Sequence, residues 1–179
     1  IQAAHNLQQG QENLTAVGRV YVPPVGVAVM GINGNITAPN TNAVVQMLEA
    51  NVNDALLALP LVNGANPELG RVGVLVNSLN KVSVPDLSAT PNPRKVAVTL
   101  NAKTGLITVK FTLSQNHPFG GSPAKITRAV TALGMIIKDG ANVEQGVGYF
   151  LLPQLPANAV EKATATRILG GQILFDKAP

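Results

Sequence analysis

Two adjoining segments of this chain alternate between apolar and polar or small residues, and this alternation limits the possible folds more than any other feature. The segments are RKVAVTLN (94–101) and LITVKFTLS (106–114), with apolar positions at Val96, Val98, Leu100, Ile107, Val109, Phe111 and Leu113. A period of two places alternate side chains on one face of a β-strand. Because the connecting residues AKTG are typical of a turn, the pattern predicts a β-hairpin.

Further segments with short apolar runs predict a mainly β chain. TAVGRVYV (15–22) and VGVAVMGI (25–32) are separated by two prolines, and each has the composition of a buried strand. Asn33-Gly34 follows as a hairpin-type turn. Other strand-like segments are RVGVLVN, KITRAVTALGMIIK, QGVGYFLLPQLP and TRILGGQILF. Short strands separated by turn signals predict an antiparallel β-sandwich or a small barrel.

One segment has a different period and predicts an α-helix near residues 42–59. Its apolar residues recur three or four apart, at Val44, Val45, Leu48, Val52, Leu56 and Leu59. The polar residues Gln46, Glu49, Asn53 and Asp54 fall on the opposite side. The start can be capped by Asn40, Thr41 or Asn42, and Pro60 ends the pattern.

The remaining organisation is that of an arm followed by one domain. Residues 1–14 are rich in Gln and Asn and have no apolar period, so we expect a flexible N-terminal arm. Residues 15–179 are long enough for a single mainly-β domain with one core. A sub-boundary is conceivable in the Pro-rich stretch 85–93.

Charged residues make up only 12% of the chain and hydrophobic residues 46%, so the surface must consist largely of neutral polar groups. Such a surface is typical of secreted or assembled proteins, and we expect an extracellular or cell-surface location, with any signal peptide removed or upstream of Ile1. No apolar run is long enough to span a membrane. The net charge of +4 comes from Lys and Arg residues with no cluster of three, so nucleic acid is not an expected partner.

The residues that enzymes use for chemistry are sparse. The chain has no Cys and two histidines, His5 and His117, without the spacing of a metal site. No nucleophile or nucleotide-binding motif is present. Carboxylates could converge in the fold as in glycoside hydrolases, from Glu49, Glu68, Asp86 or Glu144, but the chain has no Trp for a sugar platform. We expect a protein that is not an enzyme and has no cofactor, no metal and no catalytic residues.

Glycines within the apolar segments need a compensating function, because each one weakens a strand. They are Gly134, Gly146, Gly148, Gly170 and Gly171. We interpret them as bulges or barrel corners, where strands bend or backbones approach closely. The alternative is close docking of another chain along a strand edge. The donor of that docking would be the N-terminal segment, and the candidate assembly residues are Thr15, Val17, Val20, Tyr21 and Val22.

Residues 95–175 also carry a resemblance to a known class of domain. The segments VTLNAKTGLITVKFTLS, GMII, GVGYFLLPQLP and ILGGQILF, in this order, resemble the C-terminal β-domain of large secreted or surface-exposed bacterial proteins. The resemblance implies a place in cell-surface architecture and no catalytic residues.

The leading hypothesis is therefore an extracellular structural or surface-assembly subunit. It would associate with itself, for example into filaments, or dock on a surface scaffold protein, partly through its N-terminal segment. One alternative is a non-catalytic extracellular binding or adhesion module for glycan or protein, with ligand contacts from His117, Tyr149 and Phe150. A further alternative is a viral capsid or decoration protein. Asn13 and Asn35 fit the N-glycosylation sequon, and a Lys–Asn isopeptide cross-link stays open.

Overall fold

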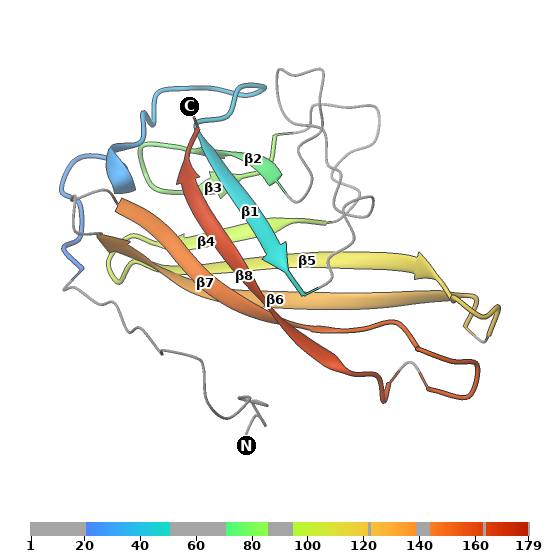
Figure 1. Ribbon diagram of the computed structural model, residues 1–179. Coiled ribbons are helices and arrows are strands. Elements are labelled where there is room, and N and C mark those ends of the chain that lie inside the picture. Colours follow the sequence, from blue (N-terminus) through green and yellow to red (C-terminus); the bar gives the residue numbers. More distant parts are fainter. Residues whose placement is uncertain are drawn as a thin grey trace, which may run out of the picture.

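The computed structural model describes residues 21–50, 71–85, 95–121, 123–138, 144–162 and 164–178. These residues form one antiparallel sheet of eight strands, in the order β3-β2-β1-β8-β7-β6-β5-β4 (Figure 1). The strands are β1 Ala43–Glu49, β2 Arg71–Val76, β3 Val82–Ser83, β4 Ala97–Asn101, β5 Leu106–Asn116, β6 Lys125–Lys138, β7 Glu144–Pro153 and β8 Ile168–Lys177. The two edge strands, β3 and β4, contact each other, so the sheet is nearly closed into a barrel.

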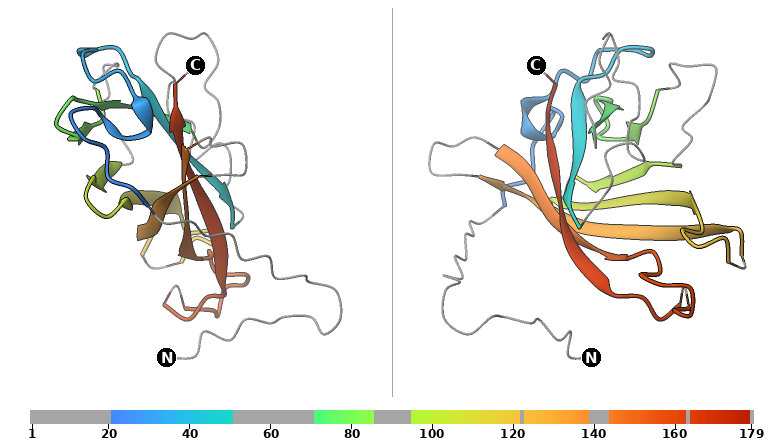
Figure 2. Two further views of the ribbon diagram at one scale, coloured as in Figure 1. Left: turned by 90° about the vertical axis from the view of Figure 1, so that its left-hand side faces the viewer. Right: turned by 45° about the vertical axis from the view of Figure 1, so that its right-hand side comes forward.

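The centre of the sheet joins the first described strand to the last. β1 pairs along its whole length with β8, from Ala43 opposite Lys177 to Glu49 opposite Gly171. The two strands run side by side in every view (Figure 2). β4 to β8 follow one another as a meander, in which neighbours in sequence are neighbours in the sheet.

The hairpin predicted from the alternating residues is confirmed. β4 and β5 pair from Ala97 opposite Lys110 to Asn101 opposite Leu106. The inward positions of β5 are buried, namely Ile107, Val109, Phe111 and Leu113, whereas Lys110 on the other face is exposed. The mainly β, antiparallel class predicted from the sequence is therefore confirmed.

The core lies inside the curled sheet and is filled from every strand. Its largest fully buried side chains include Phe111, Phe150 and Phe175, and the first two rings meet edge to face with centroids 5.4 Å apart. The three valines of β2, together with Val96 before β4 and Val98 within it, belong to the same cluster. Strands on both sides of the Pro-rich stretch thus share one core, while residues 86–94 themselves lie outside the described residues.

Glycines allow the strands of this sheet to approach closely on the inside. Gly134 and Gly148 are directly opposite each other on β6 and β7. A Cβ on Gly134 would lie 2.6 Å from the carbonyl oxygen of Val147, and one on Gly148 would lie 2.3 Å from that of Leu133. The pairing of β6 with β7 continues through this point without a bulge. The close approach of backbones that the sequence predicted is present here, but as part of a regular ladder.

The α-helix predicted near residues 42–59 is wrong for the part that the structure describes, because residues 43–49 form β1. The strand is paired along both of its edges, with β2 and β8, and it is apolar on both faces. Ala43, Val45 and Met47 are buried in the core, and Val44 on the other face is buried as well. A pattern with apolar residues on both faces contains helix-like spacings by coincidence. Residues 51–59 lie outside the described residues.

The strand predicted at 25–32 is also wrong. Residues 29–31 form a short 3₁₀ turn, and Val25 and Val27 are exposed. Gly26, Met30 and Gly31 have positive φ angles of 69°, 56° and 58°, which an extended strand cannot contain. The predicted arm, residues 1–14, and the start of the predicted strand 15–22 lie outside the described residues. Within the described ranges, no helix is long and apolar enough to cross a membrane.

Candidate functional site

The outward face of the sheet over β5 to β8 is apolar, and we call it the outer apolar face. Its large side chains are between 41% and 61% exposed and are Leu106, Leu133, Met135, Tyr149, Leu151 and Ile168. Four consecutive strands contribute to it, all of them in the meander (Figure 1). Apolar side chains that gather on adjacent strands form a continuous patch, in contrast to the isolated exposed residues found on most surfaces.

The register of the sheet places these side chains next to one another. Leu106 is opposite Met135, and Leu133 is opposite Tyr149. Directly opposed side chains on one face of an antiparallel pair have Cβ atoms about 5 Å apart, so they touch. The sequence produces this arrangement because the segments GMIIK and GVGYFLL place apolar residues at both odd and even positions. One set then fills the core, and the other faces outward.

The outer apolar face carries no charged side chain on β6, β7 and β8, except at the strand ends. No Lys, Arg, Asp or Glu occurs at the outward positions of these strands, from Thr127 to Ile137 on β6, Gln145 to Pro153 on β7 and Ile168 to Leu174 on β8. Charged groups lie at the strand ends, where Asp176 accepts a hydrogen bond from Gln145. Lys110 of β5 stands at the border. Covering this face therefore removes no charged group from water, which keeps the desolvation free energy small.

One glycine makes the surface of this face uneven. Gly170 is opposite Leu151, and a Cβ built on it would meet no atom within 4 Å. Tyr149, the most exposed large side chain of the face, is two residues before Leu151 on the same strand. The surface thus has a protruding ridge on β7 beside a notch on β8.

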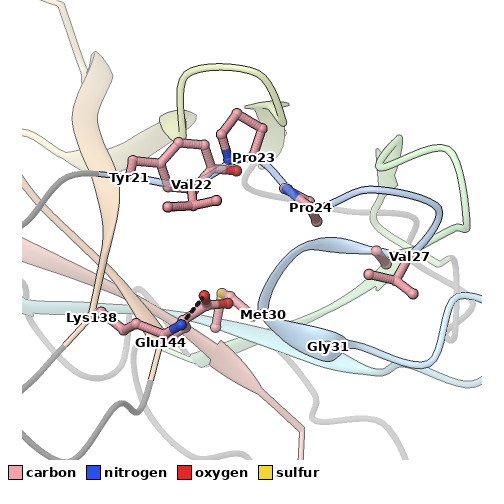
Figure 3. A pocket seen from close by; sticks show the side chains of 10 residues that line it. Tyr21, Val22, Pro23, Pro24, Val27, Met30, Gly31, Lys138 and Glu144 are labelled. Carbon is pink, nitrogen blue, oxygen red and sulfur yellow. Dashed lines mark ion pairs between the residues drawn. The ribbon is translucent and has the colours of Figure 1, made fainter.

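A separate hollow of about 270 Å³ lies where the described chain begins (Figure 3). Its walls include Pro23, Pro24, Val27 and Met30, together with Tyr21. The ion pair between the ammonium of Lys138 and the carboxylate of Glu144, 3.3 Å long, lies on the opposite side (Figure 3). The two charged side chains are 46% and 31% exposed, so water screens the pair.

Tyr21 anchors the chain at this hollow. Its hydroxyl donates a 2.8 Å hydrogen bond to the carbonyl oxygen of Ala102, and its ring covers Gly105 so closely that a Cβ there would lie 2.8 Å from it. Burial, with a smaller effect from the carboxylate of Glu144, raises the pKa of the Tyr21 hydroxyl above its usual value. The phenol is therefore held neutral, as a structural donor.

The described ranges contain no candidate metal site. Groups of three or more His, Cys, Asp or Glu residues that could hold a metal ion do not occur among the residues described. His117 is in the connection between β5 and β6, where its Nδ1 accepts a hydrogen bond from the backbone amide of Phe119. Its ring packs against Gly121. Glu68 and Asp86, two of the four carboxylates considered from sequence, lie outside the described residues.

The candidate ligand contacts do not converge. His117 is at the far end of the β5–β6 hairpin, Tyr149 is in the middle of the outer apolar face, and Phe150 points into the core with 1% of its surface exposed. Neighbouring residues on a strand face opposite sides of the sheet, so Tyr149 and Phe150 cannot touch one ligand on one face.

The candidate assembly residues are placed only in part. Thr15, Val17 and Val20 lie outside the described residues. Tyr21 is used in the chain's own fold, whereas Val22 is 74% exposed. The sequon residue Asn35 is exposed in a turn, and Asn13 lies outside the described residues.

Sequence reasoning missed the outer apolar face except for Tyr149. The available signal was the pair of segments GMIIK and GVGYFLL, which are apolar at both odd and even positions, so that a strand formed by either one has an apolar outward face. Comparisons of the chain with protein-family models, with curated proteins and with solved structures found no match.

Proposed function

We propose that this protein is a non-enzymatic, extracellular structural subunit that associates with copies of itself or with a surface scaffold. The observation that carries the proposal is the outer apolar face, a continuous surface over four strands whose outward positions on β6, β7 and β8 carry no charge away from the strand ends. Large exposed apolar patches on folded proteins mark places where another molecule binds. The cores of protein interfaces are depleted of charge and enriched in Tyr and Met, as this face is.

The low charge of the whole chain supports the same proposal. With 12% charged residues, the protein has few groups that would have to lose water when large areas of its surface are covered. A subunit that is surrounded by neighbours benefits from such a composition. An enzyme would instead need ionisable groups brought together in a cleft, and the described residues that line the hollow contribute one exposed ion pair.

The N-terminal segment contributes a second attachment in this proposal. Tyr21 holds the chain at the hollow, so the residues before it start from a defined point beside the ends of β6 and β7. Thr15, Val17 and Val20 would add a strand to a neighbouring subunit, where main-chain hydrogen bonds provide affinity and pockets take alternate side chains. Val22, exposed beside the anchor, would be the first contact outside the subunit's own fold.

Light scattering over the micromolar range, followed by negative-stain electron microscopy, tests the proposal. We expect the full chain to form species larger than a monomer, and we expect deletion of residues 1–20 to weaken that association. Replacing 1–20 by a Gly-Ser segment of equal length is the control for chain length. A chain that stays monomeric at every concentration contradicts the proposal and favours the binding module, with the hollow as its first candidate site. Closed regular particles would favour a capsid or decoration protein.

A further inference from the structure

We infer that the outer apolar face of one subunit packs against the same face of a second copy, sheet against sheet. The inference rests on the proposed self-association and names the surface and the partner. It is distinct from attachment through the N-terminal segment, which would use a strand edge.

Backbone hydrogen bonding decides what kind of element can cover this face. The N–H and C=O groups of β6, β7 and β8 are directed at their neighbours within the sheet. A single strand laid across the face would find no hydrogen-bond partners there and would leave its own backbone groups buried and unpaired. The covering element must bring its backbone bonds with it, and a second sheet does so, at a distance of about 10 Å between layers.

Charge then limits which sheet can pack there. A charged side chain on the partner would be buried against the outward positions of β6 to β8, where no opposite charge is available, and its desolvation would oppose binding. The partner face must therefore be uncharged as well. The outer apolar face of another copy meets this condition, and the charged groups of both copies, such as Lys125 and Asp176 at the strand ends, stay outside the contact.

The relief of the face suits a twofold contact with itself. The ridge formed by Tyr149 and Leu151 lies beside the notch at Gly170. In a twofold arrangement, each ridge can enter the notch of the other copy, so one surface supplies both halves of the interface. The two ridge residues are 61% and 49% exposed.

The area available is enough for a reversible dimer. Strand spacing and rise give each outward position about 30 Å² of sheet, so about fifteen outward positions on β6 to β8 provide roughly 450 Å² per copy. The two copies together bury roughly 900 Å² of sheet, more when side-chain relief is included, which is near the lower limit of about 1,000 Å² for specific interfaces. We therefore expect a dissociation constant in the micromolar range.

Charge-introducing variants with a matched control test the interface. Leu151 on the face and Leu79 in the turn between β2 and β3 are both exposed leucines, at 49% and 74%. In sedimentation velocity over a micromolar concentration series, we expect Leu151→Lys to raise the dimer dissociation constant at least 30-fold. Leu79→Lys adds the same charge and is expected to change it less than threefold. Thermal unfolding followed by circular dichroism checks that both variants are folded.

A cross-linking experiment tests the same contact without adding a charge to it. The chain contains no Cys, so Leu151→Cys and Leu79→Cys each introduce a single thiol. With a short bismaleimide we expect a covalent dimer for Leu151→Cys and a monomer for Leu79→Cys.

The possible outcomes separate this inference from the proposed function. If the wild-type chain associates, Leu151→Lys associates equally well and Leu151→Cys gives no covalent dimer, the inference is overturned while the proposed function stands. If the wild-type chain is monomeric throughout, both fail. If the monomeric chain instead floats with neutral phosphatidylcholine vesicles and Leu151→Lys does not, the face covers lipid and the inference is overturned.

Discussion

Gly170 and Gly171 are neighbours on β8, yet their surroundings are opposite. Gly171 faces the core, where a Cβ would lie 2.3 Å from the ring of Phe150. That ring cannot move aside freely, because it is 1% exposed and packs edge to face on Phe111. Gly170 faces outward with nothing within 4 Å of the same ideal position. The first glycine is thus required by packing, and the second leaves a notch in the surface.

This difference predicts opposite effects of the same substitution. Gly171→Ala should lower the free energy of unfolding by about 1–3 kcal/mol, since the added methyl overpacks the core. Gly170→Ala should change it by no more than about 1 kcal/mol, in the stabilising direction, because alanine reduces the entropy of the unfolded chain. Urea denaturation of the two variants and the wild type measures both values. Equal losses at the two positions would contradict the packing argument.

At the scale of elements, one buried side chain reinforces the pairing of β1 with β2. The amide nitrogen of Asn42 donates to the carbonyl oxygens of Asn33 and Val76, and its side-chain oxygen accepts from the backbone amide of Val76, each at 2.8 Å. The backbone of Asn42 also bonds to Val74 and Ala178. Asn42 thereby extends the ladder beyond the last strand pair and connects three segments that are distant in sequence.

Removing this side chain should therefore destabilise the sheet strongly. Asn42→Ala leaves buried backbone groups of Val76 without partners, and we expect a loss of at least about 2 kcal/mol in the free energy of unfolding. Asn77 is a suitable comparison, because its side-chain oxygen accepts bonds from Leu79 and Lys81 in an exposed turn. Water can replace it there, so Asn77→Ala should lose less than about 1 kcal/mol. Chemical denaturation measures the free energy of unfolding of both variants. Similar losses would show that the buried bonds of Asn42 stabilise the protein no more than the exposed bonds of Asn77.

At the scale of the whole molecule, the barrel has a well-filled interior and an outer side that is left apolar over β5 to β8. Association through an uncharged face depends on the hydrophobic effect, which salts that are excluded from protein surfaces strengthen. Attraction between opposite charges would instead weaken as salt is added, because dissolved ions screen exposed charges.

The dependence of self-association on salt should follow from this. We expect the dissociation constant to stay unchanged or to fall when sodium chloride is raised, because the like charges of two +4 chains are then screened. Sodium sulfate should lower it further. Sedimentation velocity of the wild-type chain in each salt makes the comparison. A marked weakening with sodium chloride would indicate that charged groups carry the contact.

The sequence alone was sufficient for the elements in which one face is buried and the other is wet. β4 and β5 alternate strictly, so their strands, their turn and their inward residues could be predicted from local pattern. β1 could not, because the adjacent residues Val44 and Val45 point to opposite faces and are both buried, and a strand that is apolar on both faces loses the period of two. Asn42, one of the residues predicted to cap the helix, is instead a buried hydrogen-bond donor and acceptor. Its partners, Asn33 and Val76, are brought to it by tertiary pairing, which local sequence does not specify.

For the candidate site, too, some properties could be predicted from the sequence and others depend on the pairing of strands. Composition determined that the chain would be β-rich, poorly charged and without Cys or Trp. Which of two adjacent apolar residues faces the core and which faces outward was decided by the sheet, as Phe150 and Tyr149 illustrate. The outer apolar face exists only because the meander sets Leu106, Leu133, Tyr149 and Leu151 on adjacent strands in register. Local sequence determines what each strand contains, whereas the pairing of strands decides what lies side by side.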